Sequence, residues 1–397
     1  MTHVLTVFID GLKPESIEYM PFLDTFSVKK KVKTELGYSI TCHASMYSGV
    51  HPDKHLRWFI WKYSPETSPF RWIKTLRLHR FENFYLKYFC YKLTGAFKRN
   101  TAFTGIPFLA YTPLKYWAYF DVSEKKFWSE PGFLEKYPTI FDILRANKVP
   151  YDIVGMVRKH VGESSKIVAQ YNPNKIKPWT YLFIGDVDPL SHKYGQDSIQ
   201  VRSRLREIDS IIEEKYKLFE RESGDFCFML FSDHGHIAVK GRVNLKSFFR
   251  ERGKRLDDYI HFIDANYARF WFRNEKEREE VSEILSEVEE GFILTEEHFK
   301  KYHVNMPDNR YGDLIFYLDT PYIFDKGNIY VMGKKWSSYD VSMHGYLPDT
   351  PNYDGVFISN KEVKNISYVQ LVDIMPSILK VLGLKIPDYV DGEVIWK

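Results

Sequence analysis

The chain has 397 residues, a length sufficient for one large α/β domain with insertions or for two domains. Of these residues 44% are hydrophobic and 27% are charged. Its formal net charge of +4 is too small to indicate a nucleic-acid partner, and we expect none. The three cysteines, Cys42, Cys90 and Cys227, are widely spaced, which argues against a disulfide framework and against a thiolate zinc site.

The beginning of the chain bears on location. "MTHVLTVFIDG" has neither a basic region nor a small-residue cleavage site, as a secretory signal would. No apolar run approaches the roughly 18 residues that a membrane span needs. We therefore expect a cytoplasmic protein.

Short apolar runs and helical patterns alternate along much of the chain. Buried strands are predicted at residues 3–10, 151–156, 180–186 and 226–233. A short helix is predicted over 139–148 and a long amphipathic helix near 197–221, where apolar residues recur three or four positions apart. This alternation predicts an α/β fold with an open, mostly parallel sheet that helices cover on both faces.

Two segments interrupt the alternation and are predicted to be insertions. Residues 56–135 are rich in aromatic and basic side chains. Residues 241–340 mix short strands at 268–273 and 314–318 with an acidic helix near 275–290. We interpret both as walls or a cap over the site. The catalytic core is then expected to comprise residues 1–55, 136–240 and 341–397.

Acidic residues end three of the predicted strands. They are Asp10, Asp186 with Asp188 just beyond it, and Asp233. Ligands bind at the carboxyl ends of strands in open α/β sheets, and carboxylates gathered there repel one another unless a cation lies between them. A single Asp-Gly after a strand is often only a turn, but three such strand ends favour a divalent metal.

Histidines accompany these aspartates. His192 follows Asp188 by four residues, His234 and His236 follow Asp233 directly, and His344 lies in a late Gly-containing loop. Carboxylate and imidazole are the ligands that zinc takes when thiolates are absent. Any one histidine in a loop is more often a surface or hydrogen-bonded residue than a metal ligand. Together they predict a two-metal hydrolase with ions about 3.5–4 Å apart.

The stretch "GYSITCHASMYSGVHPDKH", residues 37–55, contains several hydroxyl side chains that could act as a nucleophile. A serine or threonine hydroxyl needs a neighbouring base or a metal ion to become nucleophilic. No Ser-His pair is evident within the stretch, so its activation must come from elsewhere in the chain.

Several motifs taken together resemble one family. They are "IDG" at residues 9–11, "DPLSHKYG" at 188–195, "SDHG" at 232–235, "NRYGDL" at 309–314 and "HGY" at 344–346. The chain resembles the nucleotide pyrophosphatase/phosphodiesterase family of the alkaline phosphatase superfamily, from "VFIDGLKPESIEYMPFLDTF" to "DIMPSILKVLGLKIPDYVDG". This resemblance implies an alkaline-phosphatase-like sheet, with the insertions as cap segments.

The resemblance also implies a nucleophile. In the family, the nucleophile is followed by His or Asn at +4, a hydroxyl residue at +6, Gly at +10, Pro at +13 and His at +16. Counting from Ser39 gives all five matches: His43, Ser45, Gly49, Pro52 and His55. Counting from Thr41 gives none. Ser39 is therefore the candidate catalytic residue.

The metal ligands follow in the same way. The resemblance implies one metal held by Asp10, Ser39, Asp233 and His234, and a second held by Asp188, His192 and His344. Zinc is favoured, with manganese or iron as alternatives. A metal beside Ser39 would lower the pKa of its hydroxyl, and the resulting alkoxide would attack phosphorus to give a phosphoserine intermediate.

The sequence departs from the family at the substrate pocket. Many family members carry an Asn about twenty residues after the nucleophile, but the corresponding region near Ile60 has none. Arg57, Lys62 or a backbone amide could take its place. Two further pocket candidates have alternatives: His236 could line the pocket or cap a helix, and His43 could orient Ser39 or pack behind it. His236 has no counterpart among the implied ligands. Nucleotide specificity is therefore not implied.

Other activities of the superfamily stay open at this point. A phosphomonoesterase, a phosphonate hydrolase or a phospho-group transferase would use the same metals. A sulfatase would need a Pro and an Arg after the nucleophile, and residues 40–43 contain neither. A catalytically inactive binding module is disfavoured because all implied Asp and His ligands are present.

A segment of the first insertion has two interpretations. Residues 70–93 place apolar residues at helical spacing with basic residues interleaved: Ile73, Leu76, Phe81, Phe84, Tyr88, and Lys74, Arg77, Arg80, Lys87. One interpretation is a basic amphipathic helix on an anionic membrane, with a lipid-like or lipid-linked phosphate ester as substrate. The other is a helix that packs on the main domain as a pocket wall around a small-molecule ester.

Overall fold

The computed structural model describes residues 2–97, 109–156, 163–325, 330–331, 334–335 and 340–397. The chain divides into two compact units. Unit 1 comprises Met1–His55, Phe127–Ala238 and Asp340–Lys397, and unit 2 comprises Leu56–Lys126 and Val239–Tyr339. The roles predicted for the inserted segments, as pocket walls or a cap, stay predictions.

Unit 1 is built on a seven-stranded sheet. In spatial order its strands are β19 (Tyr368–Gln370), β2 (Val28–Lys33), β18 (Gly355–Ser359), β7 (Phe226–Phe231), β1 (His3–Ile9), β6 (Trp179–Ile184) and β5 (Tyr151–Val154). All neighbours run parallel except β18, which is antiparallel to both β7 and β2. The four strands predicted from the sequence are β1, β5, β6 and β7, and the predicted fold class is confirmed.

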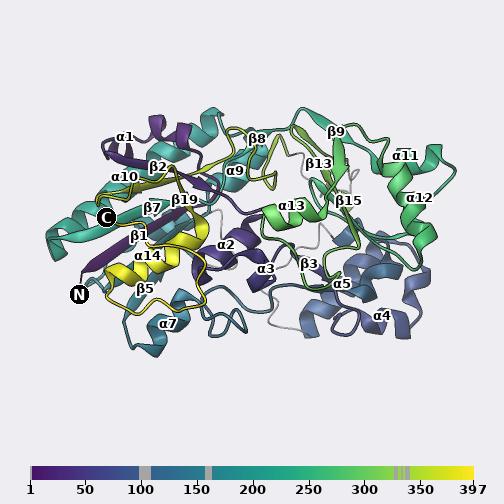
Figure 1. The fold of residues 1–397 in the computed structure, drawn as a ribbon, viewed down its shortest axis with the longest axis horizontal. Helices are drawn as coiled ribbons and strands as arrows, with labels where there is room; N and C mark the ends of the chain where they lie inside the picture. The colour runs from purple at the N-terminus through teal and green to yellow at the C-terminus, as the bar shows by residue number, and fades with distance from the viewer. Residues whose placement is uncertain (1, 98–108, 157–162, 326–329, 332–333, 336–339) are drawn as a thin grey trace. The chain divides into compact units, whose positions relative to one another are not determined.

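Strand β1 shows why this sheet is buried on both sides. Its side chains alternate between the two faces, as in any strand. Phe8 belongs to a core with α2 (Ser39–Ser48), α7 (Ile140–Ala146) and α14 (Ile374–Val381). Val7 belongs to a second core with α10 (Ile199–Ser223). A continuous apolar run is what a strand covered on both faces requires, and Figure 1 shows α14 and α10 on opposite sides of the sheet.

The predicted helices of unit 1 are present with defined N-termini. Ser198 caps α10, since its Oγ accepts a hydrogen bond from the backbone N–H of Val201. Thr139 and Asp142 form a capping box at the start of α7. The remaining elements of the unit are the 3-10 helix η1 (Pro14–Tyr19), α1 (Pro21–Asp24), α3 (Pro52–His55), α8 (Ser164–Ala169), α9 (Val187–Tyr194), β8 (Ile237–Ala238), β17 (Ser342–Met343) and η6 (Leu371–Asp373).

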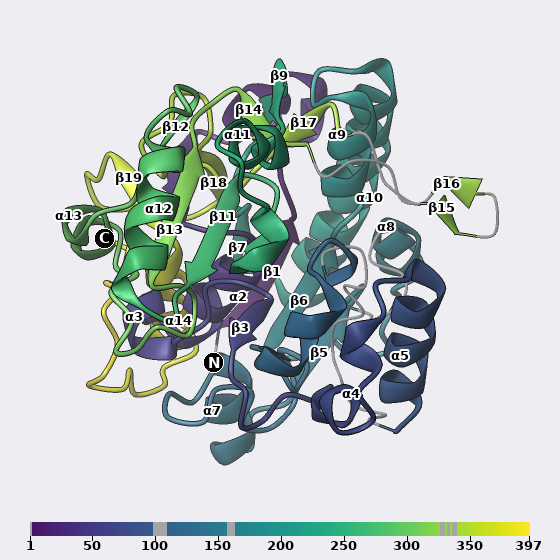
Figure 2. The same cartoon turned by 90° about the vertical axis from the view of Figure 1, so that its right-hand side faces the viewer.

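Unit 2 contains a four-stranded antiparallel sheet with a different core on each face. Its order is β10 (Ile260–Ile263), β11 (Tyr267–Trp271), β13 (Leu314–Leu318) and β12 (Gly291–Ile293). Helices α11 (Leu245–Glu251) and α12 (Glu275–Leu285) pack on one face, and Figure 2 shows α12 beside β11 and β13. The other face carries an aromatic core that includes Trp61, Trp117, Phe120 and Phe262. Much of the aromatic content of residues 56–135 is used here.

The other elements of unit 2 are short, apart from one helix of 14 residues over Phe84–Phe97. They are β3 (Trp61–Tyr63), α4 (Arg71–Thr75), η2 (Leu78–Arg80), α5 (Phe84–Phe97), η3 (Leu114–Tyr119), β4 (Phe120–Val122), β9 (Gly241–Val243), η5 (Leu256–Asp258), α13 (Glu296–Lys301), β14 (Tyr322–Phe324), β15 (Tyr330–Val331) and β16 (Lys334–Lys335).

The expectation of one amphipathic helix over residues 70–93 is wrong. The segment forms α4, η2 and α5 instead. Arg77 adopts a left-handed backbone with φ 56°, which an α-helix cannot contain, so the helical spacing is interrupted there. As a result Ile73 is buried, whereas Leu76 is 63% exposed and Phe81 is 61% exposed.

Across the described parts of the chain, no helix combines the length and the apolar character needed to span a membrane. The cytoplasmic location expected from the sequence stays a prediction.

Candidate metal centre and active site

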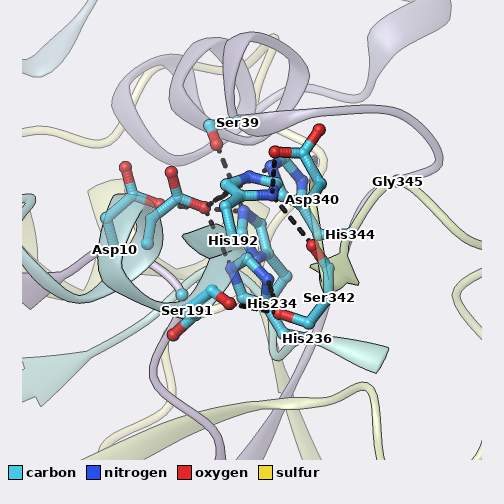
Figure 3. Close-up of polar contacts among 12 residues, drawn as sticks. Asp10, Ser39, Ser191, His192, His234, His236, Asp340, Ser342, His344 and Gly345 are labelled. Carbon is cyan, nitrogen blue, oxygen red and sulfur yellow. Dashed lines mark hydrogen bonds and ion pairs between the residues drawn. The ribbon is translucent and has the colours of Figure 1, made fainter. Parts of the chain in front are cut away.

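The topology of unit 1 gathers acidic residues at one edge of its sheet. Asp10 directly follows β1, Asp188 lies in the first turn of α9 just after β6, and Asp233 follows β7. Strands β6, β1 and β7 are parallel neighbours, so their carboxyl ends meet at the same edge. β17 pairs with β8 immediately after this loop, and the pairing brings His344 to the same place, as Figure 3 shows.

Three imidazoles surround one carboxylate oxygen of Asp188. The distance from Oδ1 of Asp188 to Nε2 is 2.9 Å for His236, 3.3 Å for His192 and 3.5 Å for His344. Asp188 and His192 are four residues apart in α9, so they share one face of the helix. Ligand atoms of Asp188, His192 and His236 all lie within 4.8 Å of one another, as do those of Asp188, His234 and His344.

The candidate nucleophile contacts a second group. Ligand atoms of Asp10, Asp233 and His234 lie within 4.8 Å of one another, and all three residues are buried. Nε2 of His234 is 3.3 Å from Oδ2 of Asp233 and 3.7 Å from Oδ1 of Asp10. Ser39 is the first residue of α2, and its Oγ lies 3.2 Å from the same Nε2, along a dashed line in Figure 3.

The hydrogen bonds of the histidines show that these groups fit divalent cations. Nδ1 of His192 lies 3.0 Å from the carbonyl oxygen of Ser342, and Nδ1 of His234 lies 3.2 Å from that of Gly235. A carbonyl only accepts, so each Nδ1 is the donor and each Nε2 presents a lone pair to a carboxylate. Metal-binding histidines are commonly oriented in this way.

Unsatisfied carboxylate oxygens support the same conclusion. Oδ1 of Asp10 and Oδ2 of Asp233 are buried and have no hydrogen-bond partner within the described residues. A buried carboxylate oxygen without a partner is costly, and a cation would remove that cost. The residues present therefore fit a divalent metal at this edge of the sheet.

The electrostatics of the groups differ. Burial, followed by the charges of Asp233 and Asp188, raises the pKa of Asp10, and burial raises the pKa of Asp233 to about 8. Burial would also raise the pKa of Asp188, but the adjacent imidazoles outweigh it and hold that pKa well below its usual range. Burial lowers the pKa of His234 to about 4, which favours the neutral ligand form.

The four predicted pocket residues lie in different surroundings. His43 is 1% exposed and packs against the rings of Phe8 and Trp128, and its ring nitrogens have no hydrogen-bond partner within the described chain. These contacts place His43, which is a residue of α2, in the hydrophobic core. His236 lies within the Asp188 group described above. Arg57 and Lys62 belong to unit 2, and their part in a pocket stays a prediction.

Two supporting residues were not singled out from the sequence. The side-chain amide of Gln196 donates to the carbonyl of Gly11 and accepts from the backbone N–H of His236, joining the loops after β1 and β7. Ser342 contacts His192 through its carbonyl and His236 through its Oγ. Ser342 stands two residues before His344, which places both side chains on one face of an extended segment. This spacing is the feature of the sequence from which Ser342 could have been identified.

The fold and the ligand groups place the chain in the class of alkaline-phosphatase-like hydrolases. A family model described as type I phosphodiesterase/nucleotide pyrophosphatase matches residues 112–347, more than half of the chain. The chain belongs to this family, and the resemblance stated from the sequence is confirmed. The matched range contains Asp188, His192, Asp233, His234 and His344, whereas Asp10 and Ser39 precede it.

Solved structures share the fold over nearly the whole chain. Human ectonucleotide pyrophosphatase/phosphodiesterase 5 aligns with a TM-score of 0.67 at 13% identity, covering 99% of this chain and 97% of that one. An inactive threonine-to-alanine variant of the murine protein, in complex with AMP, aligns with a TM-score of 0.65 at 13% identity, covering 98% and 96%. At such identities the likeness establishes the fold. No curated protein matches the chain.

Proposed function

We propose that the protein is a two-metal phosphodiesterase that acts through a phosphoserine intermediate on Ser39. The observation that carries the proposal is the position of Ser39 Oγ, 3.2 Å from Nε2 of His234, which groups with the buried carboxylates of Asp10 and Asp233. A hydroxyl among ligand atoms of this kind is what nucleophilic phosphoryl transfer requires.

The proposed ligands form two sets. One set is Asp10, Ser39, Asp233 and His234, and the other contains Asp188, His192 and His344. Zn²⁺ suits these carboxylate and imidazole donors, and Mn²⁺ or iron could replace it. Bound cations would lower the pKa of the Ser39 hydroxyl and stabilise negative charge on the phosphoryl oxygens.

The proposed reaction forms a phosphoserine on Ser39 and then hydrolyses it. Ser39 loses its hydroxyl proton to solvent, and Oγ forms a bond to phosphorus while the bond from phosphorus to the leaving oxygen breaks. The leaving oxygen takes up a proton from solvent. Water then loses a proton to solvent as it attacks phosphorus, the bond from phosphorus to Oγ breaks, and Oγ takes up a proton to restore the serine hydroxyl. Asp10, Asp233 and His234 hold the site around Ser39 throughout.

The substrate is proposed as a small or lipid-linked phosphate ester. The murine relative of 13% identity binds AMP, which is consistent with a phosphate ester of nucleotide size. A nucleotide is not favoured over other phosphate esters, because the Asn that many family members carry near position 60 is absent.

The test is hydrolysis of bis-p-nitrophenyl phosphate, p-nitrophenyl phosphate and p-nitrophenyl sulfate by zinc- and manganese-loaded protein. The proposal expects preferential hydrolysis of the diester, loss of this activity in S39A, and phosphate covalently bound to Ser39 in acid-quenched protein. Preference for the monoester or the sulfate would contradict a phosphodiesterase, and full activity of S39A would contradict the phosphoserine.

We also propose that a patch of unit 2 contacts anionic membrane surfaces. The patch consists of four exposed side chains, Leu76 (63%), Phe81 (61%), Tyr85 (63%) and Phe89 (56%). Exposed basic residues occur in the same stretch of the chain: Lys74, Arg77, Arg80 and Lys92. Exposed aromatic residues bordered by cations complement an anionic lipid surface, where the rings enter the interface and the cations meet headgroups.

Vesicle sedimentation tests this contact. We expect the protein to pellet with phosphatidylserine vesicles but not with phosphatidylcholine vesicles, and a Phe81→Ser, Phe89→Ser double variant to stay in the supernatant. Ile199→Ser is the matched control, because Ile199 is 76% exposed on unit 1. Equal behaviour of the double variant and wild type, or no binding to either vesicle, would overturn the proposal.

A further inference from the structure

His236 occupies a position that the ligand sets above do not use. Its imidazole is buried, and its Nε2 is the nearest of the three histidine nitrogens to Oδ1 of Asp188, at 2.9 Å. His192 and His236 group with Asp188, whereas His344 groups with His234 and Asp188. His236 is therefore a third side chain, beside Asp188 and His192, whose ligand atom lies close enough to share a cation with theirs.

The hydrogen bonds around His236 fix its tautomer. The hydroxyl of Ser342 donates its one proton to the carbonyl oxygen of Ser191, at 2.6 Å. Its Oγ lies 3.2 Å from Nδ1 of His236 and must act there as the acceptor, so Nδ1 carries the hydrogen. Nε2 then presents a lone pair to the carboxylate of Asp188. Two acceptor atoms 2.9 Å apart repel each other unless a cation lies between them.

The backbone around His236 holds the ring in this place. The backbone N–H of His236 donates to Oε1 of Gln196 at 2.7 Å, and the amide of Gln196 donates to the carbonyl of Gly11 at 2.7 Å. Gly11 leaves the room that the ring needs, because a Cβ there would come within 3.1 Å of Nε2 of His236. These contacts orient Nε2 of His236 toward Asp188.

We infer that His236 is a direct ligand, with Asp188 and His192, of one of the two divalent cations. The inference rests on the proposed function and enlarges its second ligand set. Two ligand atoms that share a tetrahedral zinc ion are about 3.4 Å apart, given bonds of about 2.0–2.2 Å. The separations of 2.9 Å and 3.3 Å from Oδ1 of Asp188 to His236 and His192 are close to this value.

The test measures metal binding without substrate. Wild type, H236N and H236Q are stripped with a chelator, titrated with Zn²⁺, and loaded with Co²⁺ for visible absorption. Removing a group that only orients a ligand costs about 10–100-fold in affinity, so loss of a ligand is expected to weaken one of the two Zn²⁺ sites by about 100-fold or more. The Co²⁺ spectrum of that site should change as well.

The two variants separate ligation from a hydrogen bond. Gln at 236 can donate a hydrogen bond to Asp188 from the position of Nε2, whereas Asn keeps only the donor to Ser342. Equal loss in both supports ligation, and full recovery of affinity and spectrum in H236Q overturns it. H51Q is the matched control, since His51 pairs with Glu35 away from the ligand groups. Circular dichroism of the metal-free proteins checks that each variant folds.

The outcomes also separate this inference from the proposed function. If wild type binds two ions and both variants bind them with unchanged affinity, the inference fails while the phosphodiesterase proposal stands. If wild type binds two ions, one through His236, but hydrolyses no ester, the proposed function fails and the inference stands. If wild type binds no divalent cation, both fail.

Discussion

Oγ of Ser39 lies 3.2 Å from Nε2 of His234, although the two residues are 195 positions apart in the chain. Ser39 begins α2, and His234 follows β7 by three residues. Nδ1 of His234 lies 3.2 Å from the carbonyl oxygen of Gly235, and its bond to that carbonyl leaves Nε2 facing the hydroxyl. The contact places the candidate nucleophile within a ligand group, which is the relationship on which the proposed chemistry depends.

Ser39 variants should separate the nucleophile from the rest of the site. We expect S39A to lower kcat for a diester by about 10³-fold or more, because it removes the hydroxyl that forms the proposed covalent intermediate. S39T should retain activity within about tenfold, since threonine offers the same hydroxyl. Steady-state kinetics with bis-p-nitrophenyl phosphate measure both. Comparable loss in S39T would show that the methyl group cannot be accommodated beside His234.

Metal removal should lower the thermal stability of the protein. Without cations, Asp10 and Asp233 are buried carboxylates with unsatisfied oxygens, which is unfavourable. A ligand present at 1,000 times its Kd stabilises the folded state by about 4 kcal/mol, so chelation should lower Tm by several degrees. Calorimetry with and without EDTA, followed by addition of Zn²⁺, measures the change.

A matched pair of variants checks the origin of this effect. Asp233→Asn should reduce the difference between zinc-loaded and chelated protein, because it removes a ligand. Arg145→Lys, in α7 and outside the ligand groups, should leave the difference unchanged. An identical Tm for wild type with zinc and with EDTA would contradict metal binding at these residues.

The strands and ligands could be predicted because their signals are local. β1 and β7 are continuous apolar runs that end just before Asp10 and Asp233, so strand and ligand are read from the same few residues. The position of His236 against Asp188 could not be predicted in this way. It depends on Ser342, 106 residues further along the chain, and on Gln196, 40 residues before it.

The segment 70–93 shows a different limit of the sequence. Counting apolar residues at helical spacing assumes an uninterrupted helix, and the left-handed backbone of Arg77 breaks it. No glycine or proline marks that break. Packing sets the position of the break instead, because Ile73 is buried in the aromatic core of unit 2 while Leu76 is exposed.

Gly355 is expected to position the loop that carries Asp233. It lies at the start of β18, and a Cβ there would come within 2.6 Å of the carbonyl oxygen and 2.9 Å of Oγ of Ser232, the residue before Asp233. Gly355→Ala must therefore displace Ser232, and overpacking of this kind typically costs about 1–3 kcal/mol. We expect lower Zn²⁺ affinity together with a lower free energy of unfolding.

Gly224→Ala is the control for this prediction. Gly224 has φ 65° but nothing within 4 Å of an added Cβ, so the substitution introduces backbone strain without a clash. It should lower the free energy of unfolding and leave Zn²⁺ affinity unchanged. Zn²⁺ titration of both variants decides, and unchanged affinity in Gly355→Ala would refute a positioning role for Gly355.

His261 in β10 should make unit 2 sensitive to acid. Burial lowers the pKa of His261 from 6.5 to about 4, although its Nδ1 bond to the carbonyl of Tyr259 and the charge of Asp257 act in the opposite direction. The folded protein then keeps this imidazole neutral while the unfolded chain takes up a proton below about pH 6.5. The neutral imidazole of His261 therefore contributes to stability above pH 6.5. As the pH falls to about 4 this contribution is lost, which lowers the free energy of unfolding by up to about 3 kcal/mol.

His261→Asn is expected to remove this dependence. The Asn amide can still donate to the carbonyl of Tyr259, and the nitrogen that is lost, Nε2, has no hydrogen-bond partner within the described residues. The variant should be less stable at pH 7.5 because a cavity forms, yet lose less stability than wild type between pH 7 and 4.5. Urea unfolding across this range, with EDTA throughout, gives the difference, and exposed His303→Asn serves as the control. Parallel pH profiles for wild type and His261→Asn would show that His261 is protonated in the folded protein as readily as in the unfolded chain.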